Sequence, residues 1–286
     1  MKKFIFETDI PSWANPTTLE TRTNLYLQCG IDTVMLVVDD GNGATWPSNL
    51  IVRDPRISGT NPLKATIDYL HSRGLSVVPV LNVMGLVNPA APIRPEFLLS
   101  NMVPPVYNVW DYNFIDWRSS YIAECISVCG GDALGLDYVR SVRGTWHGFI
   151  PAEDAVKAVL QKIKDKVSPH IRIMSITNSI NNLPNTQGVN PVKWYQDGLV
   201  DLVCNFNYVT PIPVAELASV PDDKLWVLIA NYETTGGQAY VKGPLEIERN
   251  ARTVLKARNV AALGIYNSNQ LKADHIPAIA HFNKML

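Results

Sequence analysis

An excess of charge of either sign is missing from this sequence of 286 residues, which carries 25 Lys and Arg against 26 Asp and Glu. Nucleic acids and anionic membranes are normally bound by clusters of Lys and Arg that displace counterions. The sequence has no basic run, which excludes a polyanionic partner recognised by charge. We therefore expect neither a nucleic-acid partner nor a membrane partner.

Long hydrophobic runs are missing too, because no apolar segment approaches the ~20 residues that span a bilayer. The opening MKKFIF (residues 1–6) is similar to the start of a signal peptide. Glu7 and Asp9 interrupt it before an apolar segment of about 7 to 15 residues could form. We expect this segment to be the first strand of a soluble protein that is cytoplasmic or virus-encoded.

Cysteine is scarce, and its four residues form no CxxC pair and show no spacing typical of a metal site. We expect buried reduced thiols, which favour a reducing compartment, at Cys29, Cys125, Cys129 and Cys204. The five histidines form no HxxxH or HExxH pattern. The sequence thus predicts no metal site and no cofactor.

What the sequence has is a regular alternation of strand-like and helix-like segments, which predicts a single-domain α/β protein over residues 1–286. Eight such βα units at this length are typical of a (β/α)8, or TIM, barrel. Apolar runs such as VMLVV and WVLIA favour parallel strands covered on both faces. A doubly wound open sheet is disfavoured because no GxGxxG follows the first strand. The expected strands are Lys3–Thr8, Thr33–Asp39, Ser76–Leu81, Ala133–Asp137, Arg172–Thr177, Leu202–Phe206, Leu225–Ala230 and Ala262–Ile265. The expected helices are Thr17–Cys29, Pro62–Arg73, Asn113–Cys129, Ala152–Val167, Pro191–Asp197, Pro213–Ser219, Pro244–Arg258 and Ile276–Lys284.

The segment after the third expected strand, Met84–Asp111, has 28 residues with five prolines and no clean periodicity. Loops of this length are usually functional or disordered. In a barrel this loop would lie at the C-terminal ends of the strands, where active sites of this fold are built.

Polar residues follow every expected strand, and in a barrel these positions converge. Carboxylates, carboxamides and phenols donate to and accept from hydroxyl groups, which suits the binding of a sugar. The loops add tryptophan rings for the apolar faces of a sugar, and one histidine. The predicted site residues are Asp9, Trp13, Asp39, Asp40, Trp46, Asn82, Asp137, Tyr138, Arg140, Trp146, His147, Asn178, Asn207, Tyr208, Asn231, Tyr232, Glu233 and Asn267.

The run ALGLDYVRS (residues 133–141) places a carboxylate, Asp137, where a buried strand is expected to end, so the role of this carboxylate has to be explained. Strand alternation places Gly135 and Asp137 on one side and the two leucines on the other. If the leucines pack against helices, Asp137 faces the barrel axis. The alternative is that Asp137 only pairs with Arg140.

Glycoside hydrolysis needs two carboxyl groups, one as proton donor and one as nucleophile or base. Asp137 is the first candidate, and Glu233, Asp39 and Asp40 are candidates for the second. Glu233 is preferred because the fourth and seventh strands lie across the barrel mouth from each other. A Schiff-base aldolase is disfavoured because every lysine lies in a helix, at a strand start or away from the strand ends.

Two segments resemble a family of glycoside-hydrolase-like barrels, the family 10-like glycosyl hydrolases. Residues 132–140, DALGLDYVR, are similar to the family pattern D-G-I-H-L-D-Y-I-R-Y-P, and residues 201–208, DLVCNFNY, to D-F-V-x-P-M-x-Y. The resemblance implies that Asp137 is catalytic and that Arg140, Asn207 and Tyr208 line the site. The chain departs from the patterns at Ala133, Gly135, Ser141, Val142 and Asn205, and the missing histidine at Gly135 affects the substrate subsite rather than the fold.

The leading hypothesis is therefore a glycosidase acting on a polysaccharide or oligosaccharide, with Asp137 as nucleophile or base and Glu233 as acid. The alternative is a carbohydrate-binding barrel without catalysis. A lyase or isomerase would call for a metal or phosphate site that the sequence does not show. The sugar, the linkage and the oligomeric state are left open by the sequence.

Overall fold

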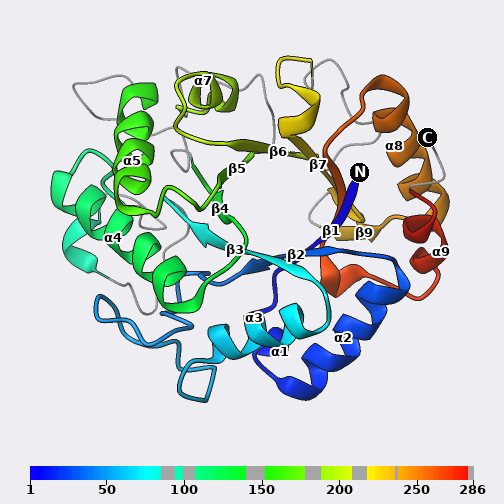
Figure 1. Ribbon diagram of the computed structural model, residues 1–286, viewed down its shortest axis with the longest axis horizontal. Helices are drawn as coiled ribbons and strands as arrows, with labels where there is room; N and C mark the ends of the chain where they lie inside the picture. Colours follow the sequence, from blue (N-terminus) through cyan, green and yellow to red (C-terminus); the bar gives the residue numbers. More distant parts are fainter. Residues whose placement is uncertain are drawn as a thin grey trace.

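Eight parallel strands close into a barrel with helices around the outside (Figure 1). The computed structural model describes residues 1–84, 94–98, 107–139, 152–177, 188–207, 218–235 and 238–282. The strands neighbour one another in the order β1-β10-β7-β6-β5-β4-β3-β2, and β2 closes on β1. The predicted (β/α)8 barrel is confirmed. The barrel strands are β1 (Lys2–Glu7), β2 (Thr33–Val37), β3 (Ser76–Asn82), β4 (Leu134–Asp137), β5 (Ile173–Thr177), β6 (Leu202–Asn207), β7 (Leu225–Ala230) and β10 (Ala262–Tyr266).

The helices begin close to the predicted positions because local capping fixes them. Asn15, Asn61 and Asn190 each precede a proline, and each side chain accepts a hydrogen bond from a backbone N–H three residues further on. Asparagine at the N-cap followed by proline at the first helical position is a strong helix start. The helices are α1 (Ile10–Trp13), α2 (Pro16–Gln28), α3 (Pro62–Ser72), α4 (Tyr112–Cys129), α5 (Ala152–Lys166), α7 (Pro191–Gln196), α8 (Pro244–Ala257) and α9 (His275–Ala280), with short 3-10 turns η1 (Pro95–Phe97), η3 (Asp222–Lys224) and η4 (Ser268–Gln270).

Some predicted segments fall outside the described residues. Most of the expected helix 213–219 does, and so does most of the long loop after β3, of which residues 94–98 and 107–111 are described. Within the described part of that loop, Leu98 and Tyr107 form an antiparallel bridge. No helix among the described residues combines the length and the apolar character that a membrane span requires.

Two apolar layers hold the barrel, one inside it and one between the strands and the helices. Alternation along each strand divides the side chains between the layers. In β1, for example, Phe4 and Phe6 belong to the inner layer and Ile5 to the outer one. Gly264 makes room inside, since a Cβ there would lie 2.5 Å from the ring of Phe4 on the neighbouring strand. All four cysteines are buried, as predicted.

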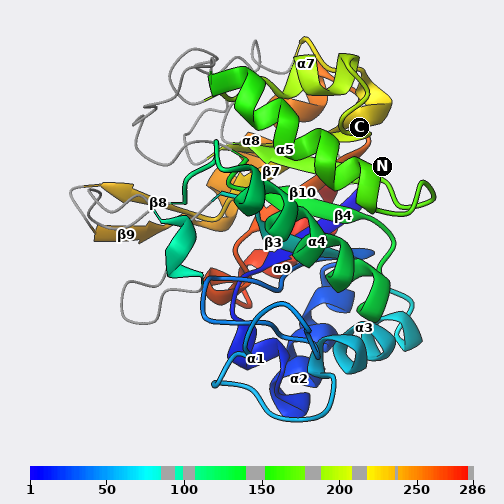
Figure 2. The same cartoon turned by 90° about the vertical axis from the view of Figure 1, so that its left-hand side faces the viewer.

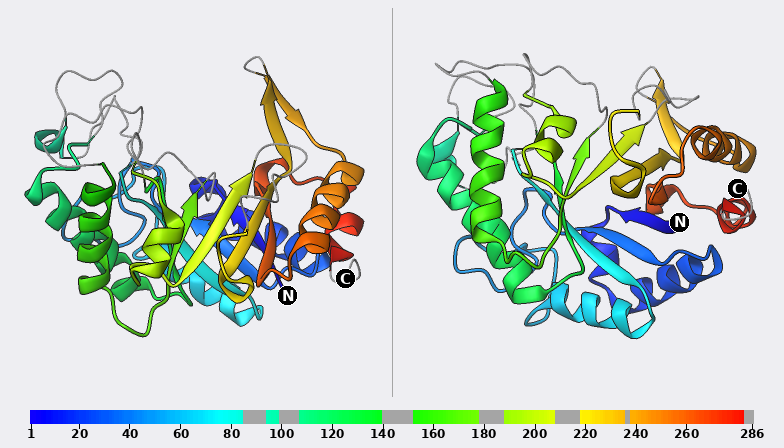
Figure 3. Two further views of the ribbon diagram at one scale, coloured as in Figure 1. Left: turned by 90° about the horizontal axis from the view of Figure 1, so that it is seen from above. Right: turned by 45° about the horizontal axis from the view of Figure 1, so that its top comes forward.

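A hairpin that the sequence analysis did not expect follows β7. Strands β8 (Tyr232–Thr235) and β9 (Gln238–Val241) pair antiparallel and form a separate two-stranded sheet. The sequence of residues 234–237, TTGG, has a composition typical of a turn. The hairpin projects beyond the end of the barrel at which the strands finish (Figures 2 and 3). It therefore belongs to the face on which a barrel of this class carries its site.

The buried imidazole of His275, at the start of α9, is predicted to make the fold sensitive to acid. Its Nε2 lies 3.0 Å from the carbonyl oxygen of Lys242, and its Nδ1 accepts a hydrogen bond of 3.2 Å from the backbone N–H of Lys272. This arrangement fits one neutral tautomer, because protonated Nδ1 could no longer accept. Burial lowers the pKa of His275 below 6.5, although the charge of Asp274 opposes the shift.

As pH falls below 6.5, the unfolded chain binds a proton at this histidine that the folded chain does not bind, so stability decreases. The loss can reach about 1.4 kcal/mol per pH unit for one group. Urea unfolding at pH 7.5 and 5.5 should show a larger decrease for the wild type than for His275→Gln, which cannot be protonated. Equal decreases in the two proteins would contradict this assignment.

Candidate functional site

Asp137 is the last residue of β4 and lies at the barrel mouth. Leu134 and Leu136 pack in the outer layer, while a Cβ on Gly135 would meet Val80 of the inner layer at 2.8 Å. The predicted alternation is therefore observed, and it puts Asp137 on the inner face of β4. The side chain is half-buried, and its Oδ1 accepts a hydrogen bond of 2.7 Å from the backbone N–H of the next residue.

The negative charge of Asp137 also affects the pKa of a thiol inside the barrel. The thiol of Cys204 on β6 is fully buried in the inner layer, and burial raises its pKa, with the negative charge of Asp137 adding to the shift.

Tyr138 has a strained backbone directly after Asp137. Its φ is 51°, in the left-handed region that residues other than glycine rarely adopt. Such a conformation costs about 1–2 kcal/mol. The segments that follow β3 and β4 remain hydrogen-bonded here, since Val83 N–H donates to Asp137 O at 2.9 Å and Met84 N–H donates to Tyr138 O at 3.2 Å. Strain of this kind is concentrated at functional sites.

Asn82 lies beside Asp137, because the two residues are register partners at the ends of β3 and β4. The residue is 9% exposed, and its side-chain Oδ1 has no hydrogen-bond partner among the described residues. A buried oxygen left without a donor costs about 1–3 kcal/mol. A ligand hydroxyl or amide that donates to Asn82 would remove this cost.

Aromatic rings complete the described part of the mouth. Tyr266, at the end of β10, has its ring centroid 4.3 Å from that of Phe206, 5.2 Å from Phe6 and 5.8 Å from Tyr232. Tyr266 was missed by the sequence analysis, which ended this strand at Ile265. The period of two from inward-facing Gly264 was the signal that could have identified it. Rings with a few polar groups among them are typical of small-molecule sites.

Glu233 is placed differently from Tyr232. The two residues are neighbours in β8, so they point to opposite faces of the hairpin, and the face of Tyr232 meets Tyr266. Oε2 of Glu233 lies 3.7 Å from Nζ of Lys242, whose side chain is 0% exposed. The sequence analysis had placed every lysine away from the strand ends. Lys242 is an exception, because its N–H donates to the carbonyl oxygen of Asn231, directly after β7.

The remaining predicted carboxylates are held in ion pairs. Asp39 is 2% exposed and lies 2.5 Å from Nη2 of Arg118 on α4. Asp40 pairs with Arg56 at 2.8 Å. Asp9 contacts Arg22 at 3.4 Å and accepts a hydrogen bond from Ser12. The carboxylate of Asp39 is buried against a helix, which argues against its predicted contact with substrate.

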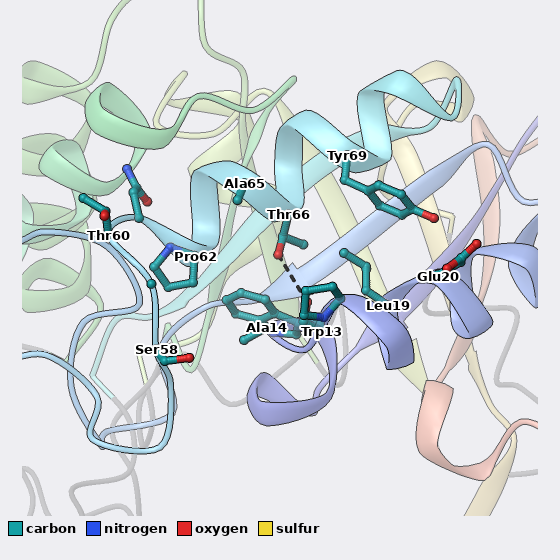
Figure 4. Close-up of a pocket in the computed structure, with 13 residues that line it drawn as sticks. Trp13, Ala14, Leu19, Glu20, Ser58, Thr60, Pro62, Ala65, Thr66 and Tyr69 are labelled. Atoms are coloured by element: carbon teal, nitrogen blue, oxygen red, sulfur yellow. Dashed lines mark hydrogen bonds between the residues drawn. The ribbon is translucent and has the colours of Figure 1, made fainter.

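The tryptophans Trp13 and Trp46 are core residues, each 1% exposed. Trp13 donates to Val37 O at 2.9 Å and lies in the wall of a cavity of about 610 Å³ between α2 and α3 (Figure 4). This cavity is on the outer flank of the barrel. Trp46 donates to Glu124 at 3.1 Å and stacks on Tyr121. The burial of both rings argues against their predicted role as sugar platforms at the barrel mouth.

Asn231 and Asn267 are hydrogen-bonded to each other. The Asn231 side chain is buried, donates to Asn267 O at 2.9 Å and accepts from Asn267 N–H at 2.7 Å. The Asn267 side chain accepts from Gln270 N–H in turn. These asparagines tie the ends of β7 and β10 together, a role different from the predicted contact with a ligand.

Several predicted site residues lie outside the described residues, namely Arg140, Trp146, His147, Asn178 and Tyr208. For Asn207 the strand position is described and the side chain is not. Over the ranges that the structure describes, no group of three or more His, Cys, Asp and Glu side chains could hold a metal ion.

Comparison with solved structures shows the same fold in enzymes that act on carbohydrates. An α-L-fucosidase isoenzyme 2 from Paenibacillus thiaminolyticus matches with TM-score 0.70 and 13% identity, over 99% of this chain and 48% of that one. A GH18 chitinase from Pseudoalteromonas aurantia matches with TM-score 0.63 and 12% identity, over 99% and 100%. The spore cortex-lytic enzyme SleL from Bacillus megaterium matches with TM-score 0.62 and 9% identity, over 97% and 73%.

The chain spans about half the length of the fucosidase. At these identities the matches show a shared fold. They do not support the resemblance to family 10-like barrels in particular. No family model matches the sequence, and no curated protein does.

Proposed function

We propose that this protein is a glycoside hydrolase that cleaves a polysaccharide or oligosaccharide at the barrel mouth. The observation that carries the proposal is the place of Asp137, half-buried on the inner face at the end of β4 and followed by a strained tyrosine. Active sites of (β/α)8 barrels lie at this face, and hydrolysis of a glycosidic bond uses a carboxylate there. The chitinase and the fucosidase that share the fold support the assignment.

Asp137 acts as nucleophile or base in this proposal, and its neighbours bind the sugar. Asn82 Oδ1 accepts from a sugar hydroxyl or amide, which satisfies a buried oxygen. The rings of Tyr232 and Tyr266 contact the apolar faces of the sugar. Substrate binding thus fills the mouth between β3, β4 and β10.

Hydrolysis also needs a proton donor, for which the sequence favoured Glu233. Its contact with Lys242, on the hairpin face away from Tyr266, instead favours a role in positioning. The Glu233→Gln variant described below distinguishes the two roles.

The proposal is tested by incubating the protein with chitin, fucosylated oligosaccharides, bacterial peptidoglycan and plant polysaccharides, with product analysis by mass spectrometry. We expect shorter oligosaccharides from at least one of them. Binding of a glycan without any cleavage would favour the non-catalytic carbohydrate-binding barrel. Absence of both binding and cleavage would contradict the proposal.

A further inference from the structure

Lys242 is a fully buried cation that the proposed chemistry does not use. It follows β9, and its backbone is fixed on both sides: its N–H donates to Asn231 O at 2.8 Å, and its carbonyl oxygen accepts from His275 Nε2 at 3.0 Å. A buried ammonium group is costly unless it is paired. The contact of 3.7 Å with Glu233, whose side chain is 36% exposed, supplies such a pair.

Other titratable groups near Lys242 lie on α8 and α9. Glu246 accepts hydrogen bonds from Gly243 N–H at 3.2 Å and from the Tyr240 hydroxyl at 3.0 Å, so it caps α8 and holds the hairpin. Burial lowers the pKa of Lys242, the negative charges of Glu233 and Glu246 oppose this, and Arg249 adds to it. His275 contributes a neutral ring through its hydrogen bond.

The contact between Lys242 and Glu233 determines which face of the hairpin points to the barrel mouth. In the register of β8 and β9, Glu233 pairs with Tyr240 on one face, and Tyr232 pairs with Val241 on the other. An ion pair that holds Glu233 toward α8 therefore directs Tyr232 toward Tyr266, 5.8 Å away between ring centroids. The side of the hairpin that faces the mouth is thus set by a contact on its opposite side.

We propose that Lys242 is a positioning residue, which holds Glu233 and so orients the β8–β9 hairpin with Tyr232 at the barrel mouth. Its effect on catalysis rests on the proposed function, because Tyr232 must contact the sugar. Its effect on the orientation of the hairpin does not depend on the proposed function. The effect on the hairpin and the effect on catalysis can therefore be measured separately.

The proposed effect of Lys242 on the hairpin is tested by amide hydrogen exchange of residues 232–235 and 238–241 in the wild type, Lys242→Met and Glu233→Gln. Methionine fills the space of the lysine stem without its charge. We expect exchange at least about tenfold faster in both variants, because local opening loses the ion pair. Lys256→Met, which removes an exposed lysine from α8, is the matched control and should leave the hairpin unchanged.

Unchanged hairpin exchange in both variants would overturn the proposal, whether or not the protein cleaves a glycan. If Lys242→Met does not fold, Glu233→Gln decides alone, since its side chain is partly exposed. With a glycan that the wild type cleaves, both variants should raise KM about tenfold and change kcat about threefold at most, as expected for lost substrate binding. A fall in kcat of about a hundredfold or more in Glu233→Gln, with little effect of Lys242→Met, would instead make Glu233 the proton donor.

Discussion

Asp137→Asn should fold like the wild type and lower kcat for glycan cleavage by about a thousandfold or more, within the range known for loss of a catalytic acid or base. The amide has nearly the same shape as the carboxylate, but it is a poor nucleophile and does not accept a proton. Its Oδ1 can still accept the hydrogen bond from the Tyr138 N–H that Asp137 accepts now. Steady-state kinetics on a cleaved glycan measure the effect.

Asp132→Asn is the matched control for this substitution. Asp132 stands at the other end of the same β-segment, where its half-exposed carboxylate accepts from Val77 N–H at 2.7 Å and contacts His71. An asparagine can keep the bond to Val77, so kcat should stay within about twofold of the wild type, as for a surface substitution. Equal losses in both variants would show that loss of any carboxylate near β4 acts through stability rather than chemistry.

Arg118→Met should be the most destabilising of the substitutions considered. Arg118 is buried, pairs with Asp39 and donates to the carbonyl oxygens of Asn82 and Val83, so it joins α4 to the ends of β2 and β3. Its removal leaves the Asp39 carboxylate buried without a cation, which typically costs about 3–5 kcal/mol. In a chain of this size, Tm should fall by roughly 6–20 °C.

Two further variants test whether the stability lost in Arg118→Met comes from the unpaired Asp39 carboxylate. Lys64→Met removes a cation from the exposed pair with Asp68 on α3, and it should cost about 1 kcal/mol or less. The double variant Asp39→Asn/Arg118→Met should be more stable than Arg118→Met alone, because no buried charge is left without a partner. Equal unfolding free energies for Arg118→Met and Lys64→Met would contradict the buried ion pair.

The barrel could be predicted from the sequence because each element has a local signal. Continuous apolar runs predicted β2 and β7, and the Asn-Pro pairs that cap α2, α3 and α7 mark where those helices begin. The hairpin after β7 was missed because its strands have four residues each and the sequence TTGGQ, which runs from the end of β8 to the start of β9, is typical of a turn.

The site was harder to predict, since its details depend on partners that are distant in sequence. Asp39 looked like a strand-end carboxylate, but it is neutralised by an arginine 79 positions further on. Trp46 looked like a loop aromatic, yet its indole is buried against Glu124 of α4. The inward direction of Asp137 was predictable, because it depends only on alternation within β4.

The most direct test of a catalytic Asp137 is glycan cleavage in H₂¹⁸O by the wild type and Asp137→Asn in parallel, with mass spectrometry of the products. Hydrolysis adds one oxygen from water to each new reducing end. We predict one ¹⁸O atom per new end with the wild type and, in the same time, about a thousandfold less labelled product with Asp137→Asn. Equal labelling by both proteins, or no labelled product from the wild type on any glycan, would contradict the account.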